Sequence, residues 1–152
     1  MLLTTALKAQ FCLGLNTRVD EANPDELFLD LTTEEFVGVA SIQFSINFDP
    51  AAYEIIGLEN SSLPDFSEGN FNERTEGNTG VLVLAWFDKT TEGITHESAE
   101  PMVTFKIRQL KESDIDFHFA DKPTFIEVVI CPNGVLGDCE VLNNFKDCNT
   151  GQ

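Results

Sequence analysis

The clearest pattern in the chain is a strict alternation of polar and apolar side chains over residues 41–48, within the strand-like stretch 39–48. The apolar members are Ile42, Phe44, Ile46 and Phe48, and the polar members are Ser41, Gln43, Ser45 and Asn47. A period of two predicts a β-strand with one face in the core, because successive side chains of a strand point to opposite faces. Asp49-Pro50 ends this strand, since proline has no N–H to donate to a ladder.

Similar segments recur along the whole chain, with turn residues between them and no helical period of useful length. The expected strands cover residues 11–19, 27–31, 39–48, 53–58, 81–87, 103–108, 115–119, 125–130 and 141–145. Residues 61–71 are rich in turn formers and are expected to be irregular. Eight or nine strands with short connections predict an all-β sandwich or jelly roll.

The strand over residues 81–87 is apolar on both faces. If Leu82, Leu84 and Trp86 enter the core, the outward residues are Val81, Val83, Ala85 and Phe87. A strand with two apolar faces is usually covered on both sides. Two coverings are considered: a loop formed by residues 61–78, or a partner protein or second copy of the chain.

Length and charge narrow the function classes. The 152 residues suit one domain, expected over residues 11–152. With 9 basic and 26 acidic residues the net charge is −17, which repels nucleic acid and anionic membranes. No apolar run approaches the roughly 18 residues of a membrane helix, so no membrane insertion is expected. The acidity suits a bound calcium ion or a soluble secreted protein, and solubility is the commoner reason.

Residues 1–10 are interpreted either as the remnant of an export signal or as an N-terminal strand. The apolar part of the segment is too short for an export signal as written. An unpaired strand at this end could also be donated to a neighbouring subunit.

Four cysteines favour an oxidising compartment. Cys131 and Cys139 bracket a turn sequence short enough for a bridge, which would leave Cys12 to meet Cys148 if the chain ends lie side by side. Sequence alone allows three pairings, and one bridge with two free cysteines is a further alternative. Zinc is disfavoured because no Cys-x-x-Cys pair is present.

No catalytic constellation stands out, and no enzymatic activity is expected. His118 alternates with Phe117 and Phe119, so it is expected to face solvent. Acidic pairs such as Glu34 and Glu35 are expected by chance among 26 acids. The chain has no Gly-rich phosphate loop and no Gly-x-Ser-x-Gly elbow.

The order of the strand motifs resembles that of the cohesin domain family, especially the cohesin-like modules of secreted and surface proteins of Bacteroidetes-type bacteria. The motifs are Val39-Ala-Ser-Ile-Gln-Phe-Ser-Ile-Asn-Phe-Asp-Pro, Glu54-Ile-Ile-Gly-Leu, Leu63-Pro-Asp-Phe, Gly80-Val-Leu-Val-Leu-Ala-Trp-Phe-Asp, Gly93-Ile-Thr and Val103-Thr-Phe-Lys-Ile. The likeness covers residues 7–130. The chain departs from the family at His96-Glu-Ser-Ala-Glu-Pro, where a Pro-Asp-Gly turn is usual, and in its cysteine-rich tail.

The resemblance implies a nine-stranded jelly-roll sandwich whose first and last strands are neighbours, which would bring Cys12 near Cys148. It also implies a non-catalytic, extracellular or surface-attached module that binds a dockerin-like protein. The partner-binding face carried over from the family contains Ser41, Gln43, Ser45, Val83 and Ala85. No cofactor is expected in the chain itself, because the calcium in that scheme belongs to the dockerin.

Two other functions are kept as alternatives. The first is a self-assembling subunit of an extracellular fibre or surface layer, held by strand addition between copies. The second is a carbohydrate-binding module. Such modules usually stack sugars on exposed tryptophan or tyrosine, whereas Trp86 and Tyr53 are expected to be buried or at a strand start.

Overall fold

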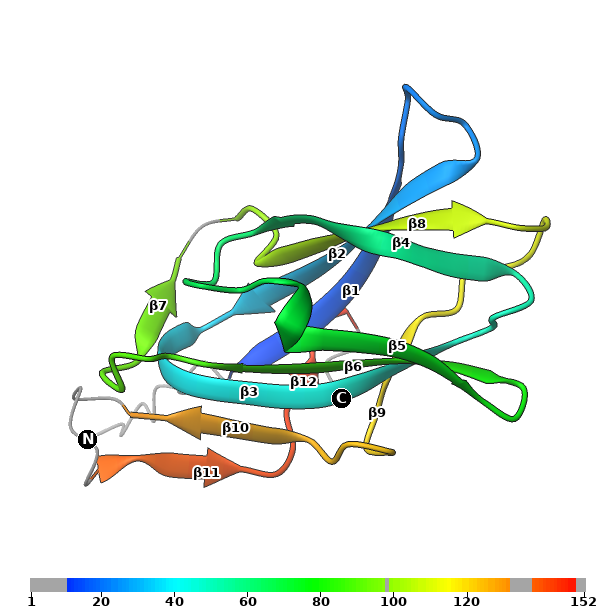
Figure 1. The fold of residues 1–152 in the computed structure, drawn as a ribbon. Coiled ribbons are helices and arrows are strands. Elements are labelled where there is room, and N and C mark those ends of the chain that lie inside the picture. Colours follow the sequence, from blue (N-terminus) through cyan, green and yellow to red (C-terminus); the bar gives the residue numbers. More distant parts are fainter. Residues whose placement is uncertain (1–10, 98, 132–137, 150–152) are drawn as a thin grey trace, which may run out of the picture.

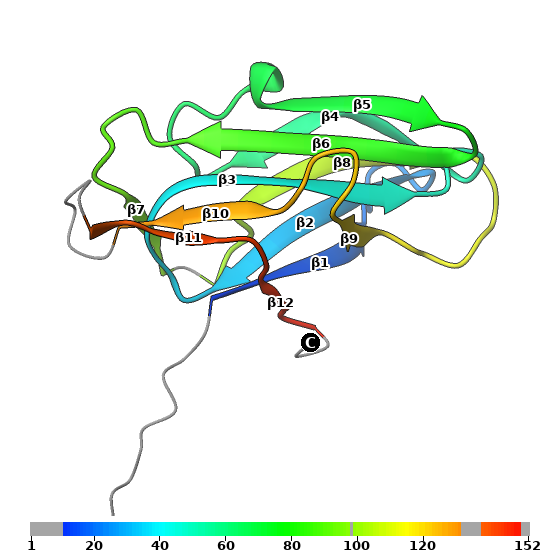
Figure 2. The same cartoon turned by 90° about the horizontal axis from the view of Figure 1, so that it is seen from below.

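Two β-sheets packed face to face form the protein. The computed structural model describes residues 11–97, 99–131 and 138–149. Sheet A has the strand order β12-β1-β2-β8-β4, and sheet B has the order β11-β10-β3-β6-β5, with the short strands β7 and β9 also paired to β3. Figures 1 and 2 show the two layers from the side and from below. The prediction of an all-β jelly-roll sandwich is confirmed.

The described residues contain twelve strands and one short 3-10 helix. The strands of sheet A are β1 (Cys12–Val19), β2 (Glu26–Glu34), β4 (Tyr53–Ser61), β8 (Val103–Gln109) and β12 (Lys146–Asp147). Those of sheet B are β3 (Phe36–Phe48), β5 (Phe71–Glu76), β6 (Thr79–Phe87), β7 (Ile94–His96), β9 (His118–Ala120), β10 (Glu127–Ile130) and β11 (Glu140–Leu142). The helix is η1 (Glu68–Asn70).

The core lies between the sheets and is built from the alternating apolar positions. On β3 the side chains of Ile42, Phe44 and Ile46 are at most 1% exposed. From the other sheet, Leu29 and Phe105 meet them with equally little exposure. Burial of apolar side chains such as these is the dominant favourable term in folding, at about 25 cal/mol per Å² of apolar surface. The alternation seen in the sequence therefore placed the core correctly.

Three strands near the C-terminal end of the chain are shorter than the sequence predicts. The predicted strand at 115–119 begins only at His118, because the Tyr53 hydroxyl contacts the backbone carbonyls of Ser113 and Asp114 at 3.3 and 3.4 Å. These contacts hold the preceding segment away from the ladder, and Ile115 is exposed. The predicted strand at 125–130 begins only at Glu127, and the one predicted at 141–145 is found at Glu140–Leu142.

Three strands were not predicted, namely β5, β7 and β12. β5 pairs with β6 in plane along its whole length, although its residues after Phe71 are polar and exposed. Its pattern lacks apolar alternation because the strand lies at the edge of the sheet. Of the two coverings considered for the outer side of β6, the loop formed by residues 61–78 is therefore not the one found.

The two chain ends meet in sheet A. β1 and β12 run parallel, with Cys12 opposite Lys146 and Leu13 opposite Asp147. Figure 2 shows β12 beside the start of β1. This agrees with the neighbouring first and last strands that the resemblance implies. The interpretations of residues 1–10 concern a segment outside the described residues.

Candidate partner-binding face

An uncharged row of side chains crosses the outer face of sheet B. Ile42 is buried, and the pairing of β3 with both neighbours puts Val129 and Phe87 beside Ser41 on the outward side. On β11, Val141 is paired with Val129 and extends the row. We call Val141, Val129, Ser41 and Phe87 the outer row. Phe87 is 61% exposed and Val141 is 54% exposed, so apolar surface faces solvent here.

The next pairs along β3 and β6 continue this face with small or polar groups. Gln43 lies opposite Ala85, and Ser45 lies opposite Val83. Ala85 is exposed, whereas Gln43 and Val83 are half-buried. Together with Ser41, these are the five residues that the resemblance assigns to the partner-binding face, and the structure brings them together on adjacent strands.

Ser45 is not available on this face, which corrects the expectation from the sequence. It is 0% exposed because the connection between β9 and β10 folds over it. Its Oγ accepts a hydrogen bond from the N–H of Thr124 at 3.1 Å and lies 3.2 Å from the carbonyl oxygen of the same residue. The hydroxyl therefore anchors the connection to the sheet, and a partner cannot reach it.

The same connection adds an apolar side chain to the face. Gln43 Nε2 donates to the carbonyl of Phe125 at 3.1 Å, and the Phe125 side chain is 56% exposed. Val81, which the sequence placed on the outward side, is 2% exposed. The exposed apolar surface is thus concentrated toward the Phe87 end of β6.

Sequence reasoning missed Val129, Val141 and Phe125. All three lie in segments that were predicted as strands, but their position beside Ser41 and Gln43 depends on which strands pair and in what register. A single sequence carries no signal for that pairing. The apolar run at 125–130 indicated only that a strand is present.

The loop after Phe87 is fixed by one buried carboxylate. Asp88 is 5% exposed and accepts hydrogen bonds from the Thr90 hydroxyl at 2.7 Å and from the N–H of Gly93 at 2.9 Å. Burial tends to raise the pKa of Asp88, but these bonds and those from the N–H groups of Thr90 and Glu92 outweigh it, so the pKa lies below its usual value. The end of β6 is therefore held firmly next to the outer row.

The outer face of sheet A is a lattice of opposite charges. Asp30, 3% exposed, accepts hydrogen bonds from Arg18 and from the Thr104 hydroxyl at 2.7 Å. The Arg18 guanidinium also lies over the ring of Phe28, with Cζ 4.7 Å from the ring centroid. Phe28 is thus covered by cations of its own sheet.

A second part of this lattice centres on Lys106. Its ammonium group lies 3.1 Å from Glu26 and 3.4 Å from Asp20. The hydrogen bond to Glu26 raises the pKa of Lys106, and hydrogen bonds from Asn23 and from the N–H of Ala22 lower the pKa of Asp20. Arg108 continues the lattice to Glu54 at 3.2 Å.

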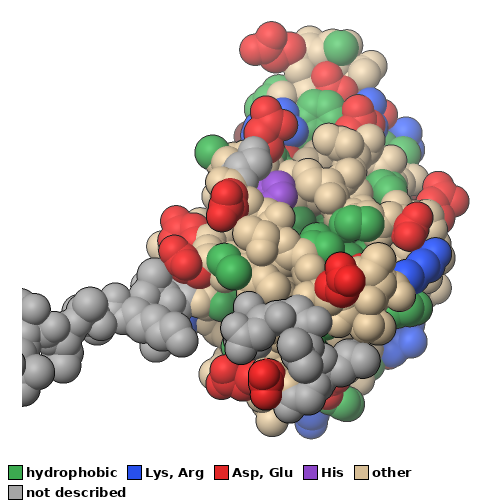
Figure 3. All heavy atoms as spheres, turned by 90° about the vertical axis from the view of Figure 1, so that its left-hand side faces the viewer, with side chains coloured by type: hydrophobic (Ala, Val, Ile, Leu, Met, Phe, Trp, Pro, Cys, Tyr) green, Lys and Arg blue, Asp and Glu red, His purple; other side chains and the backbone are tan. Residues whose placement is uncertain are grey.

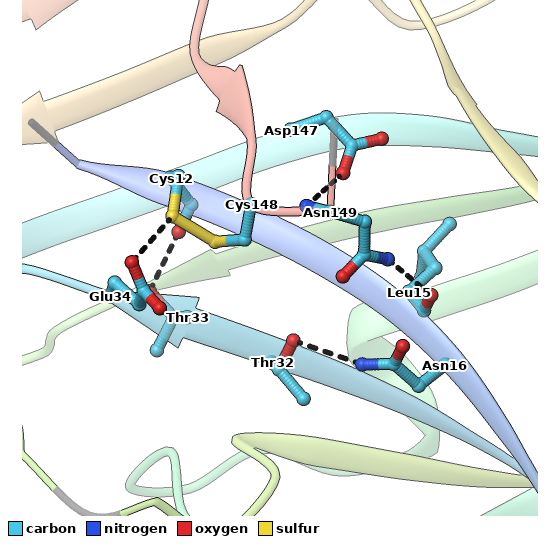
Figure 4. Close-up of a disulfide and its surroundings, with 9 residues drawn as sticks. All are labelled: Cys12, Leu15, Asn16, Thr32, Thr33, Glu34, Asp147, Cys148 and Asn149. Carbon is cyan, nitrogen blue, oxygen red and sulfur yellow. Dashed lines mark hydrogen bonds between the residues drawn. A yellow bond between two sulfur atoms is a disulfide. The ribbon is translucent and has the colours of Figure 1, made fainter. Parts of the chain in front are cut away.

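Of the cysteine pairings left open by the sequence, the structure contains the one with two bridges that the resemblance favours. Cys12 is bonded to Cys148, and Cys131 is bonded to Cys139. Figure 4 shows the first bridge beside Glu34, whose Oε2 lies 3.7 Å from Cys12 Sγ. In the described part of the chain, the one cluster of possible metal ligands consists of Cys12, Glu34 and Cys148. Because both of its sulfurs are in a disulfide, this cluster is not a metal site.

Residues weighed for enzymatic or sugar-binding roles lie where the sequence placed them. His118 is exposed and pairs with Asp116 at 3.1 Å. The ring N–H of Trp86 donates to the carbonyl of Pro64 at 2.8 Å, and Trp86 and Tyr53 are 3% and 1% exposed. The only tryptophan and the only tyrosine of the chain are therefore unavailable for stacking on a sugar.

Comparison with known proteins identifies the family to which this chain belongs. The family model described as cohesin domain matches residues 20–125, which is more than half of the chain. The protein therefore belongs to the cohesin domain family, whose members are non-catalytic modules for protein–protein interaction that bind dockerins and occur typically in extracellular or surface proteins. No curated protein matches the chain. Among the described residues, no helix is long and apolar enough to span a membrane.

Proposed function

We propose that the outer face of sheet B, centred on the outer row, binds a dockerin-type protein module and attaches it to an extracellular or surface complex. The observation that supports this most directly is the uncharged row across four paired strands, which ends in Phe87 at 61% exposure. Exposed aromatic side chains in an otherwise uncharged patch are typical anchors of protein interfaces.

The electrostatics of the molecule define the complementary partner. The chain carries a net charge of −17, whereas the outer row carries none. Acidic side chains are spread over the end of the molecule seen in Figure 3, and basic ones lie mainly at its margins. A partner with an apolar centre and a basic rim satisfies both features, and long-range attraction would speed its association. No catalytic step and no cofactor of this chain is part of the proposal.

The test is binding of calcium-loaded dockerin modules to the full chain, measured by calorimetry. Phe87→Asp should weaken binding by about 30-fold or more, because it replaces the exposed aromatic anchor of the interface with an unpaired charge. Leu110→Asp is the matched control, since Leu110 is also exposed, at 51%, but lies outside this face. Equal affinities of the two variants would contradict the proposed face.

Light scattering of the same samples separates a heteromeric partner from self-assembly. The proposed function expects a monomer in the absence of the dockerin module. Assembly of the chain alone, abolished by Phe87→Asp, would assign the face to a second copy instead.

A further inference from the structure

The strands that end the two sheets differ in how their outer edges are protected. An outer edge presents unpaired N–H and C=O groups, and native proteins usually block such edges with charges, bulges or short strands. β4 has two register shifts, β5 carries Glu73, Arg74 and Glu76, and β11 is only three residues long and begins with Glu140. Each of these three edges has a recognised protection.

The edge of β1 has none of these protections. β12 covers it only at Cys12 and Leu13, and among the described residues no strand lies beside the remainder up to Val19. This remainder contains no proline and shows no register shift against β2. Its one charged residue, Arg18, is bound to Asp30 on the outer face of the sheet.

The hydrogen bonds of β12 show which backbone groups face this edge. The N–H of Cys148 donates to the carbonyl of Leu13 at 2.8 Å, and Asn149 Nδ2 donates to the carbonyl of Leu15 at 2.8 Å. Backbone groups alternate in direction along a strand, so the N–H and C=O groups of Thr17 and Val19 face the same edge. The N–H and C=O groups of Asn16 and Arg18 point instead toward β2.

The described C-terminal residues turn away before reaching this part of β1. The N–H of Asn149 donates to the Asp147 carboxylate at 2.8 Å, which forms a turn directly after β12. Only the side chain of Asn149 continues along β1, where it takes the carbonyl of Leu15. Figure 4 shows this side chain lying along β1 beside the disulfide. The ladder therefore stops at the position where a further strand could begin.

A pocket lies next to the same stretch of β1. It has a volume of about 310 Å³ and is lined by Leu15, Asn16, Thr17, Leu29, Ile115 and Phe117. Ile115 is 53% exposed and Val19 is 65% exposed. In strand addition, alternate side chains of the added strand point to one face of the sheet. Those on the inner face would enter this pocket.

We propose that the β1 edge from Leu15 to Val19 accepts an extended segment of another protein, which adds a strand to sheet A. Backbone hydrogen bonds at Thr17 and Val19 would give affinity, and the pocket would select the side chains at alternate positions through Ile115 and Phe117. The acceptable segment carries positive charge outside its apolar positions, since the chain has a net charge of −17 and Asp114 and Asp116 flank Ile115. The same charge disfavours pairing with a second copy. This site lies on the other sheet from the outer row and does not depend on the function proposed for it.

The test uses the full chain and a seven-residue synthetic peptide in which valine and threonine alternate between terminal lysines. Amide hydrogen exchange is followed by NMR at Thr17 and Val19, with Asn16 and Arg18 as internal references bonded to β2. The two odd-numbered amides should exchange rapidly in the free chain. Saturating peptide should slow them by at least about tenfold and leave the references unchanged.

Side-chain selection is tested with two matched variants. Ile115→Asp should weaken peptide binding by about tenfold, because it places a charge in the pocket. Leu110→Asp, which changes a similarly exposed residue outside the pocket, should bind as the unchanged protein does. Phe87→Asp should also retain peptide binding, so failure of the proposed function and failure of this inference can be told apart.

Three results would overturn the inference. The first is the absence of protection at Thr17 and Val19 at millimolar peptide. The second is protection of these amides in the free chain that disappears when residues 150–152 are removed, which would assign the edge to the chain's own tail. The third is protection that grows with protein concentration without peptide, which would assign the edge to a second copy.

Discussion

The outer faces of the two sheets differ in the side chains that they expose to solvent. On sheet A, Arg18 and Lys106 bind acidic neighbours and cover Phe28, so charges and the aromatic ring are already paired within the chain. On sheet B, the outer row has no charge, and Phe87 is left exposed. A face whose groups are satisfied internally has little to gain from a partner, because binding would first have to break those contacts. The difference explains why the candidate interface is assigned to sheet B.

Each sheet also contains one of the two disulfides. Their removal should cause the largest loss of stability among these predictions. Cys12–Cys148 ties the edge of sheet A across a sequence separation of 136, whereas Cys131–Cys139 joins β10 to β11 across 8. Replacing both Cys12 and Cys148 with serine should lower the free energy of unfolding by about 4 kcal/mol, because a long loop regains most entropy when unfolded. The corresponding change at Cys131 and Cys139 should cost about 2 kcal/mol.

Urea unfolding of the two double variants checks this difference. Equal losses of unfolding free energy would show that the sequence separation between the cysteines is not what sets their contributions.

Removal of the central carboxylate of sheet A should have the next largest effect. Asp30→Ala leaves the Thr104 hydroxyl and Arg18 without their buried acceptor, so we expect a loss of about 3 kcal/mol in unfolding free energy. Dockerin binding should be unchanged. Glu54→Ala is the control, because Glu54 is half-exposed and its pairing with Arg108 should contribute less than about 1 kcal/mol. Thermal unfolding of both variants measures the difference. Equal losses of unfolding free energy would show that Asp30 contributes no more than a surface ion pair does.

On sheet B, the buried hydroxyl of Ser45 should contribute a smaller amount. Ser45→Ala removes its bonds with the backbone N–H and carbonyl of Thr124, at an expected cost of about 1 to 2 kcal/mol. Ser41→Ala is the matched control on the same strand and should cost less than about 0.5 kcal/mol. Denaturant midpoints measure both, and a Ser45→Ala protein as stable as Ser41→Ala would show that the β9–β10 connection is held by other contacts.

The smallest expected effect is the pH dependence of the charged lattice. The pKa of Asp20 is lowered, so its stabilisation is present above the ordinary value of 3.8 and is lost as pH falls through the lower folded-state pKa. The pKa of Lys106 is raised, so its stabilisation is present below 10.5 and is lost as pH rises through the higher folded-state pKa. Between these limits, melting temperature should change little through either group.

Asp20→Asn provides the comparison for the acid limit. Its melting temperature should fall less steeply below pH 4 than that of the unchanged protein, because one of the coupled protonations is absent. If the melting temperatures of the two proteins fell equally below pH 4, Asp20 would not contribute to the acid limit of stability.

Much of the fold was predictable because a strand with one buried face has apolar residues at every second position. The alternation at Ile42, Phe44 and Ile46 gave β3, and Leu82, Leu84 and Trp86 gave the inward face of β6. β5 was missed for the converse reason, since an exposed edge strand needs no apolar alternation. The candidate face was predictable only in part, because Val129 and Val141 reach Ser41 through strand pairing rather than through nearness in sequence.

The sequence by itself determined the class of fold and the inward residues of the long strands, and its four cysteines favoured disulfides, since each follows from local composition or spacing. The tertiary structure decided which cysteines pair, that Ser45 is buried under the β9–β10 connection, and that the edge of β1 is uncovered from Leu15 to Val19 among the described residues. These features depend on contacts between segments far apart in the chain. Their register and order are set by packing of the whole sandwich, which local patterns do not encode.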